Sequence, residues 1–77
     1  MEYYRKVGIK IMKVVDARGL SCPEPIMLTN EALKSESAVT VLVDEAHQKT
    51  NVEKFASEKG KKTSVTDKDG YFEIIVE

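Results

Sequence analysis

Cysteine and histidine are almost absent from this sequence, and their scarcity excludes two classes of small protein. The chain has a single cysteine, Cys22, and a single histidine, His47. One cysteine cannot form a disulfide within the chain, and one cysteine with one histidine does not supply the ligands of a zinc site. Because small secreted domains usually depend on disulfides, we expect a cytoplasmic protein without a bound metal or other cofactor.

Long apolar runs and an excess of positive charge are also missing. The longest apolar stretches, such as Val41-Leu42-Val43, have three residues, whereas a membrane-spanning helix needs about 20. The 12 Lys and Arg residues are balanced by 13 Asp and Glu residues, and aromatic residues make up 6% of the chain. The short apolar stretches predict no membrane-spanning segment. The chain also lacks a basic surface with interleaved aromatic residues, so we expect no direct binding to nucleic acid.

The chain does contain enough apolar sequence for one small domain. Its 77 residues are 42% hydrophobic, which suits a single folded unit and argues against disorder. A domain of this length leaves most of its side chains in contact with water. Any chemistry is therefore expected at the surface and not in a large enclosed cleft.

Apolar residues recur at strand and helix periods in the order strand, helix, strand, helix, strand, strand. Prolines open the first helix, a capping-box pattern marks the second, and a turn containing glycine joins the last two strands. The predicted segments are a strand from Met12 (or already within residues 7–11), a helix from Pro23–Pro25 to about Lys34, a strand at Val39–Val43, a helix that starts at Thr50 or several residues earlier and ends before Gly60, a strand around Thr63 and Val65, a turn at Asp67–Gly70 and a strand at Phe72–Val76.

This order predicts an α+β two-layer sandwich. Two strands joined through a helix form a parallel pair, whereas the final hairpin is antiparallel. A mixed four-stranded sheet with both helices on one face then buries the apolar stripes. The side chains expected to face this interior are Val39, Val41, Val43, Phe72, Ile74 and Val76 from the strands, and Ile26, Met27, Leu28, Thr29, Ala32, Leu33, Val52, Phe55 and Ala56 from the helices. Leu42 and Ile75 are expected on the open face.

Cys22 is the candidate reactive residue, because its neighbours place it where a helix begins. Pro23 restricts Cys22 to extended backbone conformations, so the cysteine is expected at or near the N-cap. The amides and the positive end of a helix favour a thiolate there. Arg18 would add positive charge, and Glu24 would oppose it. Pro23 and Pro25 stiffen the turn, which would hold an exposed sulfur in a fixed direction.

The segment Asp16-Ala17-Arg18-Gly19-Leu20-Ser21-Cys22-Pro23-Glu24-Pro25 resembles the signature of the TusA/SirA/YedF family of small sulfur-carrier proteins. That signature is a Cys-Pro-x-Pro box preceded by Asp-x-x-Gly-Leu. The similarity extends from Met12 to Glu77, which predicts a TusA-like domain over residues 12–77. Residues 1–11 are then a short extension or the start of the first strand. The Asn51-Val52-x-x-Phe55-Ala56 pattern is closest to the YedF branch.

The resemblance implies a function and a set of site residues. Family members have the same two-layer fold, which also occurs in the C-terminal domain of bacterial translation initiation factor 3. Their cysteine accepts sulfane sulfur from a cysteine desulfurase or a rhodanese-like donor and passes the persulfide to an acceptor protein. Cys22 would then be the carrier, and Pro23 and Pro25 its scaffold. Glu24 is the variable position of the box, and Asp16, Arg18 and Gly19 precede it.

Two other function classes are compatible with a lone exposed cysteine on this fold. The first is a redox or regulatory module whose thiol is capped reversibly by a small thiol. The second is an RNA-binding module, suggested by the fold shared with the initiation factor domain and opposed by the net charge of -1. A mixed disulfide without uptake of sulfane sulfur would favour the first. Retention on RNA that depends on salt would favour the second.

Overall fold

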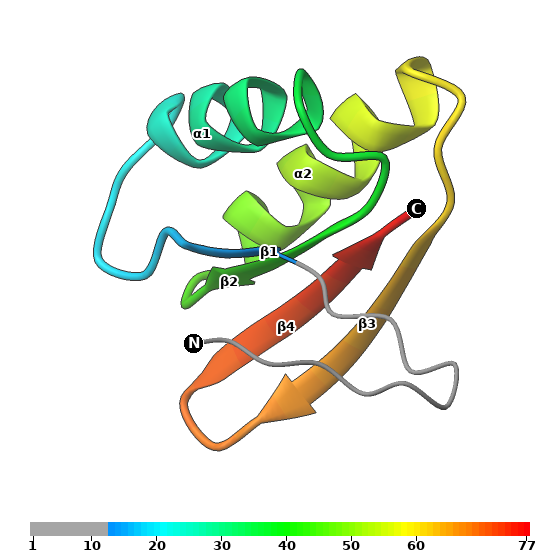
Figure 1. Ribbon diagram of the computed structural model, residues 1–77. Helices are drawn as coiled ribbons and strands as arrows, with labels where there is room; N and C mark the ends of the chain where they lie inside the picture. The colour runs from blue at the N-terminus through cyan, green and yellow to red at the C-terminus, as the bar shows by residue number, and fades with distance from the viewer. Residues whose placement is uncertain (1–12) are drawn as a thin grey trace, which may run out of the picture.

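The computed structural model describes residues 13–77, and these residues form one sheet and two helices (Figure 1). The first half of the chain contributes β1 (Lys13–Asp16), α1 (Glu24–Leu33) and β2 (Val39–Val43). The second half contributes α2 (Ala46–Glu58), β3 (Thr63–Lys68) and β4 (Tyr71–Val76). The predicted order of elements is therefore confirmed. The interpretation of residues 1–11 and the proposed strand start at Met12 lie outside the described residues.

The strands form a mixed sheet in the order β1-β2-β4-β3. Strands β1 and β2 are parallel, with Lys13 paired to Val39 and Asp16 paired to Leu42. Strand β4 lies antiparallel to both β2 and β3. The β3–β4 hairpin closes through Asp69 and Gly70, within the predicted turn. This arrangement is the predicted α+β two-layer sandwich.

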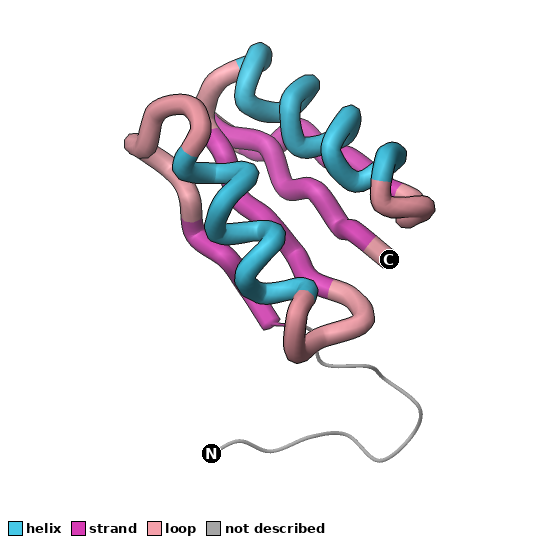
Figure 2. Tube along the Cα trace, turned by 90° about the horizontal axis from the view of Figure 1, so that it is seen from above, coloured by secondary structure: helices cyan, strands magenta, loops and turns pink. Residues whose placement is uncertain are grey.

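Both helices cover the same face of the sheet and begin at the same end of the molecule (Figure 2). This follows from the parallel pairing, because α1 continues from the end of β1 and α2 continues from the end of β2. The connections after the two strands therefore emerge side by side (Figures 1 and 2). The shared end of the sheet is the natural place for a site built from both connections.

The core lies between the sheet and the helices and consists mainly of valine and alanine. Strand β2 supplies its centre, since every second side chain, at Val39, Val41 and Val43, is fully buried. The predicted alternation is confirmed there and on β4, where Phe72 is half-buried. Leu42 is half-buried on the opposite face. The full set of buried apolar residues is Val15, Ala17, Ala32, Ala38, Val39, Val41, Val43, Val52, Ala56, Ile74 and Val76.

Helix α1 buries a narrower stripe than the sequence pattern predicts. Pro25, Thr29 and Ala32 are its buried residues, and the Thr29 hydroxyl donates to the carbonyl of Pro25 at 2.8 Å. Met27 and Leu28 were expected in the core, but they are 60% and 40% exposed. The helix lies on a sheet with only one neighbouring helix, so a single row of small side chains meets the strands and the adjacent positions face solvent.

Helix α2 begins earlier than its capping-box pattern indicates. Its first residue is Ala46 and its N-cap is Glu45, so a start at Thr50 is wrong and the alternative of an earlier start holds. The Thr50 hydroxyl donates to the carbonyl of Ala46 at 3.2 Å, one turn back inside the helix. The helix ends at Glu58, and Gly60 follows with a φ of 78°, as expected for a residue just past a helix end.

Neither helix of residues 13–77 has the length and apolar character needed to cross a bilayer. The longer of the two, α2, has 13 residues, whereas a membrane-spanning helix needs about 20. Its buried face also includes a polar residue, Gln48.

The valines of the sheet provide a test of this core. Val41→Ala removes a fully buried side chain, and we expect it to lower the free energy of unfolding by about 2 kcal/mol. Val14→Ala is the matched control, because Val14 is also a strand residue but is 56% exposed. Its effect should stay below about 0.5 kcal/mol. Urea denaturation measures both values, and equal effects would contradict the assigned burial.

Candidate functional site

Cys22 is an exposed free thiol at the end of the sheet where both helices begin. It directly precedes Pro23, which is the N-cap of α1, so the predicted position at or near the N-cap is confirmed. No side-chain hydrogen bond caps the helix. Because Cys22 is exposed, its sulfur is accessible at the beginning of α1.

The residues after Cys22 hold it through backbone hydrogen bonds. The amide of Glu24 donates to the carbonyl of Ser21 at 2.9 Å, which closes a turn around Cys22 and Pro23. Pro25 is the second residue of α1 and is buried. It thus anchors the first turn of the helix against the core. The prolines of the box have different positions, with Pro23 exposed and Pro25 packed inside.

The residues before Cys22 are attached to the sheet. The amide of Ala17 donates to the carbonyl of Leu42 at 2.8 Å, which extends the β1–β2 pairing by one residue. The amide of Leu20 donates to the carbonyl of Ala17 at 3.3 Å, and the Leu20 side chain packs against the core. The β1–α1 connection is therefore attached to the sheet at its start and to the helix at its end, and residues 21–23 are exposed between the Leu20 side chain and α1.

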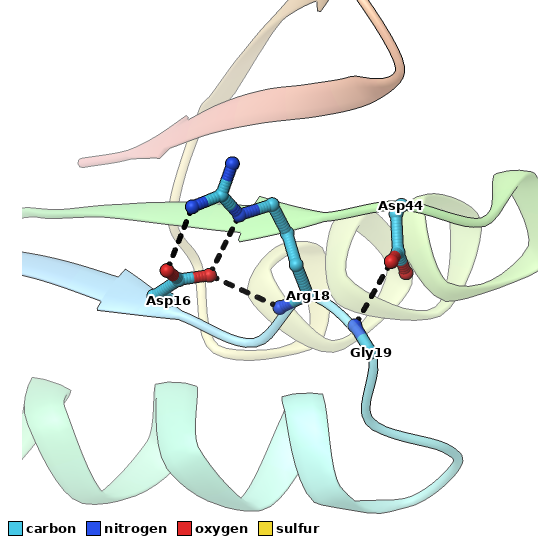
Figure 3. Close-up of polar contacts among 4 residues, drawn as sticks. All are labelled: Asp16, Arg18, Gly19 and Asp44. Carbon is cyan, nitrogen blue, oxygen red and sulfur yellow. Dashed lines mark hydrogen bonds and ion pairs between the residues drawn. The ribbon is translucent and has the colours of Figure 1, made fainter.

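Arg18 pairs with Asp16 and reaches toward β4 (Figure 3). Its Nε donates to Oδ1 of Asp16 and its terminal nitrogen donates to Oδ2, both at 2.9 Å. The guanidinium carbon lies 4.7 Å from the centre of the Tyr71 ring. From the sequence, Arg18 is expected to add positive charge near Cys22. In the structure the Arg18 guanidinium is paired with the Asp16 carboxylate, because the two side chains form a bidentate pair.

This pair shifts the titration of both groups. The hydrogen bonds from the Arg18 side chain lower the pKa of Asp16 from 3.8 to about 2, and the hydrogen bond from the Arg18 amide acts in the same direction. The Asp16 side chain in turn raises the pKa of Arg18 above its usual value. Both side chains remain ionised across the range in which thiol chemistry takes place. The bidentate geometry gives the pair a fixed direction despite its exposure.

Gly19 connects the loop to the end of β2. Its amide donates to Oδ2 of Asp44 at 2.9 Å, as Figure 3 shows. The φ of Gly19 is 81°, a conformation that residues with a side chain rarely adopt. A Cβ at this position would meet no atom within 4 Å. Glycine is therefore required for its backbone angle and not for space.

Asp44 and Tyr71 also contact the loop, although no sequence pattern assigns them to the site. Asp44 follows the last residue of β2 and Tyr71 is the first residue of β4, and neither is near Cys22 in the sequence. Asp44 could have been found from the predicted topology. A polar residue at the end of a strand parallel to β1 lies at the end of the sheet where the β1–α1 loop emerges. The predicted residues Asp16, Arg18, Gly19 and the box from Cys22 to Pro25 all lie between the last residue of β1 and the second residue of α1.

A lysine cluster occupies the opposite end of the helices. Lys34, Lys59 and Lys61 line a shallow hollow of about 430 Å³ together with Asn30 and Leu33. Lys61 donates to the carbonyl of Ser37 at 2.9 Å. Within residues 13–77, no three His, Cys, Asp or Glu side chains come together in a way that could hold a metal ion.

Comparisons with known proteins agree with this arrangement. The family model described as sulfurtransferase TusA matches residues 13–77. The chain is similar to a SirA-like protein from Desulfitobacterium hafniense with a solved crystal structure. The two share 34% sequence identity and a TM-score of 0.79, over 84% of this chain and 95% of the other. No curated protein sequence matches the chain significantly.

The pairing of Asp16 with Arg18 predicts an unusually acidic carboxyl group. NMR titration of Asp16 should give a midpoint near pH 2, and Arg18→Gln should move it toward the ordinary 3.8. Because the pKa is lower in the folded state, the pair stabilises the fold above about pH 3.8. That contribution disappears as the pH falls from there toward 2. A midpoint near 3.8 in the unmodified protein would contradict the pairing.

Proposed function

Because the chain belongs to the TusA family of sulfurtransferases, we propose that it carries sulfane sulfur on Cys22 as a persulfide and relays it to an acceptor protein. The observation that supports this most directly is the exposed thiol held at the beginning of α1. A carrier must present its sulfur to two different proteins in turn. An accessible sulfur on a loop attached at both ends meets that requirement.

The loading step exchanges one sulfur–sulfur bond for another. The Cys22 thiolate attacks the terminal sulfur of a donor persulfide, which breaks the donor's sulfur–sulfur bond and forms a new one on Cys22. The donor cysteine leaves as a thiolate and takes up the proton that Cys22 lost. No net oxidation or reduction takes place. Unloading repeats the same exchange, with the terminal sulfur of the Cys22 persulfide attacked by an acceptor thiolate.

The surrounding residues support this step without taking part in it. Pro25 anchors the first turn of α1 in the core, and Pro23 leads the chain from Cys22 into the helix. The Asp16–Arg18 pair and Gly19 hold the preceding loop. Glu24 lies in the first turn of α1 and is exposed. We assign it to the surface that meets partner proteins.

The partners we propose are a cysteine desulfurase or rhodanese-like donor and a downstream acceptor protein. Direct contact with nucleic acid is not part of this proposal, since acidic and basic residues are balanced. The assignment to the YedF branch, a TusA-like domain over residues 12–77 and a cytoplasmic location all remain predictions. Exposed apolar side chains on α1, at Met27 and Leu28, suit contact with a protein.

Sulfur loading tests the proposal. Incubation with a cysteine desulfurase and cysteine should add one sulfur atom to the chain, because Cys22 is its only thiol. Intact mass spectrometry measures the addition, and peptide mapping should place it on the peptide that contains Cys22. Cys22→Ser is the control and should remain unmodified.

Failure to load would have two distinguishable forms. A protein that keeps its unmodified mass with every active desulfurase and rhodanese tested would contradict the carrier proposal. A mixed disulfide with a small thiol, formed without uptake of sulfane sulfur, would also contradict it. That second result would favour a redox or regulatory module.

Cys22→Ser also separates function from stability. Since Cys22 is exposed and lies outside the N-cap, the substitution should change the free energy of unfolding by less than about 0.5 kcal/mol. A buried cysteine would instead cost about 1–3 kcal/mol, because the hydroxyl would enter an apolar site. Thermal unfolding resolves the two cases, since a domain of this size shifts by roughly 4–8 °C per kcal/mol. A large loss of stability would exclude an exposed carrier thiol.

A further inference from the structure

The hydrogen bond between Gly19 and Asp44 joins the two connections that emerge at the sheet end. Gly19 belongs to the β1–α1 loop that presents Cys22, and Asp44 belongs to the β2–α2 connection. The amide-to-carboxylate distance is 2.9 Å, and the residues are 25 positions apart in sequence. Most other hydrogen bonds of the loop are made within residues 16–24 or, at Ala17, to the β2 backbone.

Asp44 is itself held in a defined place. It directly follows Val43, which is fully buried at the end of β2, and directly precedes Glu45, the N-cap of α2. Its carboxylate is therefore attached to the most deeply buried strand of the sheet. A hydrogen bond to a charged acceptor is also stronger than one between neutral groups.

The Asp44 bond acts at the point of the loop where the chain turns from Arg18 toward Leu20, and it adds to the backbone hydrogen bonds of Ala17 and Leu20. The positive φ of Gly19 directs the chain from β1 toward Leu20 and Ser21. Leu20 packs on the core only partly, and the next three residues are exposed. Release of the Gly19 amide would therefore loosen the segment that leads directly to Cys22, although Leu20 keeps its own hydrogen bond to Ala17.

We propose that Asp44 is a positioning residue for Cys22. Its carboxylate holds the Gly19 amide and thereby keeps the sulfur in its place before α1. This proposal rests on the proposed function, because position matters only if Cys22 exchanges sulfur with partner proteins. Asp44 does not touch the reacting sulfur and takes no part in bond formation.

Two neutral substitutions separate the hydrogen bond from the charge. Asp44→Asn removes the charge but keeps an oxygen that accepts from Gly19, whereas Asp44→Ala removes both. Asp67→Ala serves as the control for loss of one exposed carboxylate on β3, at the far edge of the sheet. The measurements are amide hydrogen exchange at Gly19, alkylation of Cys22 by neutral iodoacetamide, and urea denaturation.

We expect Gly19 exchange to be about 2- to 10-fold faster in Asp44→Ala than in Asp44→Asn, the range that corresponds to loss of one hydrogen bond. Alkylation of native Cys22 should differ in rate by a similar factor between Asp44→Ala and Asp44→Asn, because the sulfur leaves its fixed place before α1 in the alanine variant. Alkylation in urea should be equal in the two variants. Asp67→Ala should match the unmodified protein in both native measurements.

Equal native alkylation rates in Asp44→Asn and Asp44→Ala would overturn the proposal, even if the alanine variant unfolds at lower urea concentration. That pattern would give Asp44 a structural role alone. These rates are measured without a sulfur donor, so they do not depend on the carrier function. If the unmodified protein fails to load sulfur, the proposed function is contradicted. The alkylation rates would still show whether Asp44 positions Cys22.

Discussion

The parallel pairing of β1 with β2 is the constraint on which the site depends. Two parallel strands end at the same edge of a sheet, so the segments that follow them emerge together. Here those segments are the loop that carries Cys22 and the connection that carries Asp44. An antiparallel pair would place these ends at opposite edges. The Gly19–Asp44 hydrogen bond and the common starting end of the helices both follow from this pairing.

The loop before Cys22 is exposed and yet has many attachments. An exposed ion pair such as Asp16–Arg18 contributes little stability by itself. Its effect here is geometric, because it joins residues two positions apart and fixes the direction of the chain as it leaves β1. Backbone hydrogen bonds at Ala17 and Leu20 add to this constraint. Several weak contacts thus define one conformation that no single contact would maintain.

Local patterns in the sequence predict the helices and strands better than they predict which distant residues contact the loop before Cys22. Alternating valines on β2 and the proline box before α1 are local signals, and the structure agrees with both. The contacts of Asp44 and Tyr71 join residues that are distant in sequence, so no periodicity reports them. A local pattern also misplaces the start of α2, which the capping box puts at Thr50. The helix begins at Ala46, three residues after the end of β2. The capping-box pattern at Thr50 is a local preference and lies inside this helix.

Core and site are almost separate sets of residues in this domain. The valines of β2 and β4 and the alanines of the helices make the core, whereas Asp16, Arg18, Gly19 and Cys22 are exposed. Ala17 and Pro25 are the exceptions, since each is buried and lies within the segment that presents the thiol. Because both residues are packed in the core, they fix the two ends of the exposed segment that carries the sulfur. A substitution that enlarges Ala17 would therefore disturb the core and the thiol segment together, whereas the exposed Cys22 side chain has no part in the packing of the core.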